Sequence, residues 1–157
     1  MQNKSSSKHG YYPFQITCCV PEEGKAPYPS YTQGLARNCG MPEFIINYQA
    51  FGADVNAAIL HFAYDYFVDP KNSGKLNAIL NGKIIKLTGK QLSPAHMSNS
   101  PLVFCFREVS PFFEGIQEAY GKGIEKLAKK FGWRFIQIWV DGDDFALEDE
   151  YYRNDDI

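Results

Sequence analysis

The chain has 157 residues, of which 45% are hydrophobic and 15% aromatic, and its formal net charge is −2. This length predicts one domain, the aromatic content excludes wholesale disorder, and no apolar run approaches the roughly 20 residues of a membrane-spanning helix. Residues 1–10 are polar and predict a flexible lead-in without a secretory signal. We expect a single α+β domain over residues 11–150, an acidic tail over residues 151–157 and a cytoplasmic location, with signal-independent export left open.

Short apolar segments predict three strands in the first third of the chain. They span residues 14–20, 30–36 and 43–48, and loops that contain Pro and Gly separate them. Gly34, inside the second segment, indicates a bulge or the close approach of another backbone or ligand. Together the three strands favour an antiparallel meander.

Two amphipathic segments predict the main helices. In residues 54–68 the apolar side chains of Val55, Ile59, Phe62 and Tyr66 have helical spacing, and Asp69-Pro70 is a stop signal. Residues 110–131 have the same periodicity, with Ser110 as a cap. Glycines inside the second segment favour a break in it.

The remaining segments predict connectors and three more strands. Residues 71–75 indicate a connector, residues 76–80 are ambiguous between helix and strand, and Asn81-Gly82 is typical of a type I′ hairpin turn. Strands are expected over residues 83–87, 102–109 and 134–140, and residues 88–101 are expected to be a loop. The predicted fold class is α+β: an antiparallel or mixed sheet of five to six strands with two main helices packed against the same face.

The charge is unevenly distributed along the chain. Residues 141–157 contain eight acids and one base, a charge of −7, whereas residues 1–140 contain 15 bases and 10 acids, a charge of +5. This pattern indicates either a solvated acidic end or a basic surface that the end shields or that meets an anionic partner. The basic residues are scattered and include no arginine-rich run, which argues against a nucleic-acid partner.

Few residues suggest catalysis. Cys39 lies in a polar loop, and His96 follows Pro94 in another loop, so a cysteine nucleophile with a histidine base is one hypothesis. The cysteines and histidines match no zinc pattern, and the acids after residue 140 lack the spacing of an EF-hand loop. We therefore expect neither a metal nor a cofactor.

The polar residues in the strand motifs are the candidate ligand-binding residues, although buried hydrogen-bonded anchors would explain the same pattern. They are Tyr31, Thr32, Gly34, Arg37, Glu43, Gln137 and Asp141.

Four stretches, in order, resemble a bacterial domain-of-unknown-function family, numbered 4262. They are Tyr-Thr-Gln-Gly-Leu at residues 31–35, Met-Pro-Glu-Phe-Ile-Ile at residues 41–46, the helix after Phe51-Gly52, and Phe-Ile-Gln-Ile-Trp-Val-Asp at residues 135–141. The resemblance covers roughly residues 12–150. Val140 stands where that family usually has proline. The family implies a fold and no assigned chemistry.

The leading functional hypothesis is a non-enzymatic binding or interaction domain whose partner is a small molecule or a protein. The alternative is a small hydrolase or transferase with a loop site formed by Cys39 and His96. Tyr151-Tyr152 could form an interface patch, which leaves a homodimer open. No membrane association is expected.

Overall fold

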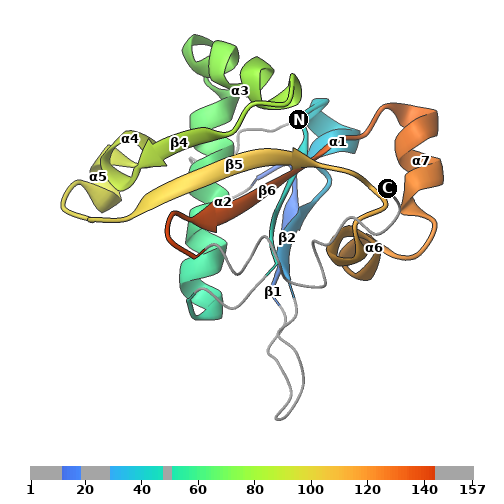
Figure 1. The fold of residues 1–157 in the computed structure, drawn as a ribbon, viewed down its shortest axis with the longest axis horizontal. Helices are drawn as coiled ribbons and strands as arrows, with labels where there is room; N and C mark the ends of the chain where they lie inside the picture. Colours follow the sequence, from blue (N-terminus) through green and yellow to red (C-terminus); the bar gives the residue numbers. More distant parts are fainter. Residues whose placement is uncertain (1–11, 19–28, 48–50, 144–157) are drawn as a thin grey trace.

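The computed structural model describes residues 12–18, 29–47 and 51–143, and in that part of the chain a six-stranded sheet is flanked by helices (Figure 1). The strands are β1 (Gln15–Cys18), β2 (Ser30–Gln33), β3 (Glu43–Ile46), β4 (Ile85–Thr88), β5 (Val103–Val109) and β6 (Phe135–Val140). The helices are α1 (Leu35–Cys39), α2 (Ala53–Val68), η2 (Pro70–Asn72), α3 (Ser73–Leu80), α4 (Gly89–Leu92), α5 (Pro94–Met97), α6 (Glu114–Tyr120) and α7 (Ile124–Phe131). The predicted lead-in over residues 1–10 and tail over residues 151–157 lie outside the described residues.

The strand order is β1-β2-β3-β6-β5-β4, so the two central strands come from opposite halves of the chain. Every pair is antiparallel except β3 and β6, which run parallel with Glu43 beside Phe135. A parallel pair needs a crossover connection, and here that connection contains α2 through α7 together with β4 and β5. The predicted α+β class with a mixed sheet is confirmed, and β1, β2 and β3 form the expected meander.

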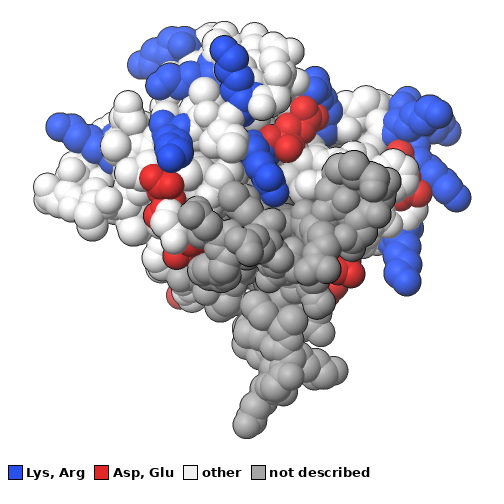
Figure 2. All heavy atoms as spheres, in the orientation of Figure 1, with Lys and Arg blue, Asp and Glu red and all other residues white. Residues whose placement is uncertain are grey.

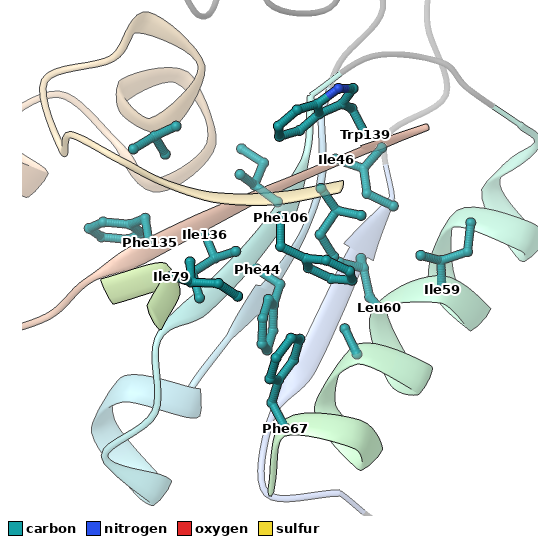
Figure 3. Close-up of a cluster of buried hydrophobic side chains, with 14 of the residues drawn as sticks. Phe44, Ile46, Ile59, Leu60, Phe67, Ile79, Phe106, Phe135, Ile136 and Trp139 are labelled. Carbon is teal, nitrogen blue, oxygen red and sulfur yellow. The ribbon is translucent and has the colours of Figure 1, made fainter. Parts of the chain in front are cut away.

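One face of the sheet packs against α2 and α3. The ring of Phe44 stacks on Phe67 of α2 with centroids 5.8 Å apart, and Phe67 meets Phe106 of β5 edge-on at 5.2 Å. Ile79 of α3 adds to this cluster beside Ile136 (Figure 3). Each fully buried side chain of this size contributes roughly 1.5–3 kcal/mol, so this cluster is a major source of stability.

The other face carries α6. Successive strand residues point to opposite faces, so Phe135 faces away from Ile136. The ring of Tyr120, at the end of α6, contacts Phe135 at 5.0 Å and Tyr31 at 4.9 Å. The expectation that both amphipathic segments cover one face is therefore wrong. Both faces need cover because every residue of β3 and β6 is buried.

Helix α2 matches its predicted bounds, but the face that it buries is rotated from the predicted one. The side chains that reach the core include Ile59, Leu60, Ala63 and Phe67, whereas Val55 is 47% exposed. The helix is apolar over much of its circumference, so periodicity alone did not select the buried stripe. No helix in the described part of the chain combines the length and apolarity needed to cross a bilayer.

The segment between α2 and β5 is more helical than predicted. The expected connector forms η2 and the first turn of α3, and the expected loop contains α4 and α5. Asn81-Gly82 ends α3 instead of turning a hairpin, because both backbone N–H groups donate to carbonyls of that helix. A capping box at Thr88 and Gln91, which the sequence analysis did not use, starts α4.

Two further boundaries differ from the prediction. The second strand ends at Gln33, because Gly34 has φ of 107° and starts α1. The second long helix is divided into α6 and α7, as its glycines favoured, with Gly121 and Gly123 at positive φ between them. Ser110 does not cap the helix; its hydroxyl accepts from the N–H of Phe112 at 3.0 Å.

Candidate functional site

A groove of about 630 Å³ lies where the β1-β2-β3 side of the sheet meets α1, α6 and α7. Its floor is formed by the first residues of the parallel pair, Glu43 and Phe135, and one wall comes from residues 12–15 before and within β1. The lining residues are Tyr12, Pro13, Phe14, Gln15, Gln33, Gly34, Arg37, Asn38, Glu43, Tyr120, Ile124, Leu127, Trp133 and Phe135. Aromatic and aliphatic side chains therefore share the lining with polar ones, Gln15, Gln33, Arg37, Asn38 and Glu43.

Glu43 is only 5% exposed, and its carboxylate is held by four hydrogen-bond donors. Oε2 accepts from the N–H groups of Gly34 at 3.1 Å and Ala36 at 3.0 Å. Oε1 accepts from the hydroxyl of Thr32 at 2.8 Å and from the N–H of Leu35 at 3.3 Å. Burial raises the pKa of Glu43, and these hydrogen bonds oppose the rise. The carboxylate thus fastens the start of α1 to β3.

Gly34 allows this arrangement through its backbone. Its φ of 107° is strained for residues with a side chain, and a Cβ there would lie 3.4 Å from the backbone of Pro13 and Phe14. The side chain of Asn38 donates to the carbonyl of Pro13 at 2.7 Å, which ties α1 to the segment before β1. The predicted close approach at Gly34 is therefore one of backbone to backbone.

The aromatic wall of the groove is anchored by Tyr120. Its hydroxyl donates to the backbone carbonyl of Thr32 at 2.7 Å, so α6 is connected directly to β2. Burial raises the pKa of Tyr120 well above its ordinary value, with a smaller contribution from the nearby Glu43. Tyr120 is therefore a fixed, neutral side chain in this site.

The groove lining also includes Arg37 and Tyr12. The exposed Arg37 places its guanidinium carbon 5.8 Å from the ring centre of Trp133, within the range of a cation–π contact. Tyr12 packs against the imidazole of His61 on α2 with centroids 4.3 Å apart. Burial lowers the pKa of His61, so this imidazole favours its neutral form.

The structure brings together five of the seven predicted ligand-binding residues. Gly34, Arg37 and Glu43 line the groove, while Tyr31 and Thr32 support it through Tyr120 and Glu43.

The other two predicted residues lie elsewhere. Gln137 is fully buried in β6 and accepts from Nε of Arg107 at 2.6 Å. Asp141 follows the far end of β6, roughly 20 Å along the strand from Phe135, and its carboxylate pairs with Lys86 at 3.3 Å.

Cys39 and His96 have different surroundings. Burial and the nearby Glu43 both raise the pKa of the Cys39 thiol, which is the opposite of what a nucleophilic thiolate needs. His96 stacks on Phe62 of α2 at 5.1 Å, and its Nδ1 lies 3.1 Å from the Ser93 hydroxyl. The hydrolase alternative gains no support from this geometry.

Sequence reasoning missed the residues that give the groove its apolar character. They are Tyr12, Tyr120, Leu127 and Trp133. Tyr120 and Leu127 lie in the predicted helical segment 110–131, whereas Tyr12 and Trp133 lie between predicted elements. Helical periodicity placed Tyr120 and Leu127 on the predicted apolar stripe, but it did not reveal that Leu127 is 43% exposed. Among the described residues, no group of three or more His, Cys, Asp or Glu side chains could hold a metal ion.

Comparison with known proteins adds no relative to this description. No family model, curated protein or solved structure matches the chain. The resemblance to the family numbered 4262 stays a prediction that rests on the order of its four motifs.

Proposed function

We propose that the chain is a non-enzymatic binding domain and that the groove is its ligand site. The observation that carries the proposal is that aromatic and aliphatic side chains line the groove together with one cation, the exposed Arg37. A ligand with an apolar body and one anionic group fits this arrangement, because the body gains from leaving water and the anion gains from the guanidinium.

The internal contacts of the groove favour binding over catalysis. The Glu43 carboxylate is occupied by backbone and hydroxyl donors, and the Tyr120 hydroxyl is occupied by the carbonyl of Thr32. A general acid or base must be able to reach a substrate proton, and these two groups already hold protein partners. They shape the groove and do not project into it as reactive groups.

Tryptophan fluorescence provides a direct test. The chain has two tryptophans, and Trp139 is 4% exposed in the sheet, so a ligand in the groove should change chiefly the emission of Trp133. We expect aromatic monocarboxylates to change this emission saturably, and amines of the same shape to bind at least about fivefold more weakly.

Two matched variants locate the effect. Leu127→Asp places a charge in the groove, whereas Val55→Asp changes a side chain of similar exposure, 47% against 43%, on α2. Binding should be lost in Leu127→Asp and retained in Val55→Asp. Equal binding by both variants, or no saturable response to any carboxylate, would contradict the proposal.

A further inference from the structure

Four side chains at the edge of the groove form a continuous run of cations and rings. The guanidinium of Arg37 contacts the indole of Trp133, and this indole stacks on Phe131 with centroids 5.6 Å apart and planes 27° apart. The ammonium of Lys130 lies 5.3 Å from the ring centre of Phe131. We call these four residues the cation–aromatic run. It extends from α1 across the end of α7.

The run lies where three hollows adjoin, because Trp133 lines all of them. The first is the groove. The second, of about 180 Å³, lies between the turn before β3 and the end of α7 and includes Pro42 and Phe131. The third, of about 450 Å³, is lined by residues 111–112 and by α7 and includes Phe112 and Lys129. Together they extend beyond the groove and could hold a chain segment several residues long.

The exposed apolar groups here are not explained by packing. Phe112 and Phe131 are 54% and 57% exposed, and they rank among the most exposed large apolar side chains in the described residues. Lysines in the last turn of α7 are explained by the helix dipole, but that effect does not account for exposed rings beside them. Large exposed apolar groups of this kind mark interaction surfaces.

The charge of this surface is mainly positive, although Glu125 also lines the third hollow. Lysine and arginine side chains gather over α7 (Figure 2), which has three lysines and one glutamate. No carboxylate in the described ranges forms an ion pair with Arg37, Lys129 or Lys130. A partner could therefore pair with these cations without displacing an internal carboxylate.

We propose that this surface binds a short acidic peptide segment of another protein, with an aromatic or aliphatic anchor in the groove. The inference rests on the proposed function, since the anchor occupies the same groove. Carboxylates on either side of the anchor would reach Arg37 and Lys130, which lie at the two ends of the cation–aromatic run. Complementary charge supplies orientation and association rate, and the buried anchor supplies most of the affinity.

The same surface is poorly suited to single-stranded nucleic acid. Bases bind by stacking on free ring faces, but Trp133 and Phe131 already stack on each other and each also contacts a cation. Most of the cations are lysines of one short helix, which gives few phosphate contacts.

Fluorescence polarisation with a labelled heptapeptide, Glu-Asp-Glu-Phe-Glu-Asp-Glu, tests the proposal on the full chain. Arg37→Glu and Lys130→Glu should each weaken binding at least about fivefold, and Leu127→Asp should abolish it. Lys90→Glu is the matched control, because Lys90 is also an exposed lysine in the last turn of a helix, and it should change binding less than about twofold. Lys130→Gln repeats the test without a new negative charge, and thermal unfolding confirms that each variant is folded.

Two further measurements test whether the aromatic anchor and the charges of the peptide contribute to binding. A peptide with Ala in place of Phe should bind at least about tenfold more weakly, and raising the salt concentration should weaken the parent peptide. The inference is overturned if Arg37→Glu and Lys130→Glu bind the peptide as tightly as the wild type does. It is also overturned if an oligothymidylate binds more tightly than the acidic peptide. If peptides fail while small carboxylates still bind in a Leu127-dependent way, the inference fails and the proposed function stands.

Discussion

The Glu43 carboxylate lies at the floor of the groove, where two effects on its protonation oppose each other. Burial removes it from water and disfavours its charge, whereas three backbone N–H groups and the Thr32 hydroxyl favour the charge. Burial is the larger effect, so the pKa is raised above its ordinary value of 4.5. A single side chain therefore couples the geometry of α1 to pH.

Glu43→Gln should lower the free energy of unfolding, because at least one backbone N–H of residues 34–36 then faces an NH₂ group whichever way the amide turns. The expected loss is about 1–3 kcal/mol for one buried donor left without an acceptor. Glu114→Gln, at an exposed carboxylate on α6, is the matched control and should have little effect.

The wild-type protein and Glu43→Gln also test how stability depends on pH. A raised pKa means that the folded chain binds the Glu43 proton more tightly than the unfolded chain does. The contribution of Glu43 protonation to stability is therefore fully present below the unfolded-state pKa and is lost as pH rises through the folded-state pKa. In urea titrations from about pH 4 to about pH 7, the stability difference between wild type and Glu43→Gln should shrink as pH rises. A difference that grows over this range would contradict the assignment.

At the scale of elements, the junction between α6 and α7 determines where α7 lies as a wall of the groove. Gly121 and Gly123 turn the chain at positive φ, and Gln117 bridges the turn. Its Nε2 donates to the carbonyl of Pro111 at 2.8 Å, and its Oε1 accepts from the N–H of Gly123 at 3.0 Å. One amide thus holds α7, with Leu127 on it, at a fixed angle to α6.

Gln117→Ala should lower the free energy of unfolding by about 1–2 kcal/mol, because it removes the partners of two backbone groups. Gln117→Glu should be less stable than the alanine variant, since a carboxylate would face both the Pro111 carbonyl and Glu125. Lys122→Ala, an exposed change in the same turn, is the control. Chemical denaturation of the four proteins ranks them, and equal stability of the alanine and glutamate variants would refute the bridging role.

Elements were predictable where local pattern and tertiary context agreed. The bounds of α2 and the cores of all six strands follow from periodicity and turn residues. The hairpin turn predicted at Asn81-Gly82 was wrong because this dipeptide suits both a hairpin and the end of a helix. Only the preceding residues 73–80, which fold as α3, distinguish the two. The expected loop over residues 88–101 became two single-turn helices, which carry too little periodicity to detect.

At the scale of the whole molecule, the groove is a product of topology. Its walls come from residues 12–15, 33–43 and 120–135. The β1-β2-β3 meander brings the first two segments together, and the pairing of β6 with β3 adds the third. Glu43 could be selected from sequence because it is charged within an apolar strand, and Gly34 because it is a glycine within a predicted strand. Tyr120 and Trp133 could not, since nothing local distinguishes a groove aromatic from a core aromatic.

The strand order also predicts which strands unfold locally most and least often. β3 and β6 have hydrogen-bonded neighbours on both sides and are buried throughout, whereas β1 and β4 lie at the edges. Hydrogen exchange should therefore be slowest for amides of β3 and β6 and faster by orders of magnitude in β1 and β4. Amides of β6 that exchange as fast as those of β4 would show that the central pair is not the stable unit.

The position of β6 has a consequence for synthesis on the ribosome. When residues 12–109 have emerged, β1-β2-β3 and β4-β5 can each form, but the strand that joins them has not yet been made. Until β6 arrives, β3 and β5 each present an unpaired hydrogen-bonding edge, which is a template for association with other chains. A nascent chain stalled before Phe135 would thus be two half-sheets in need of a chaperone.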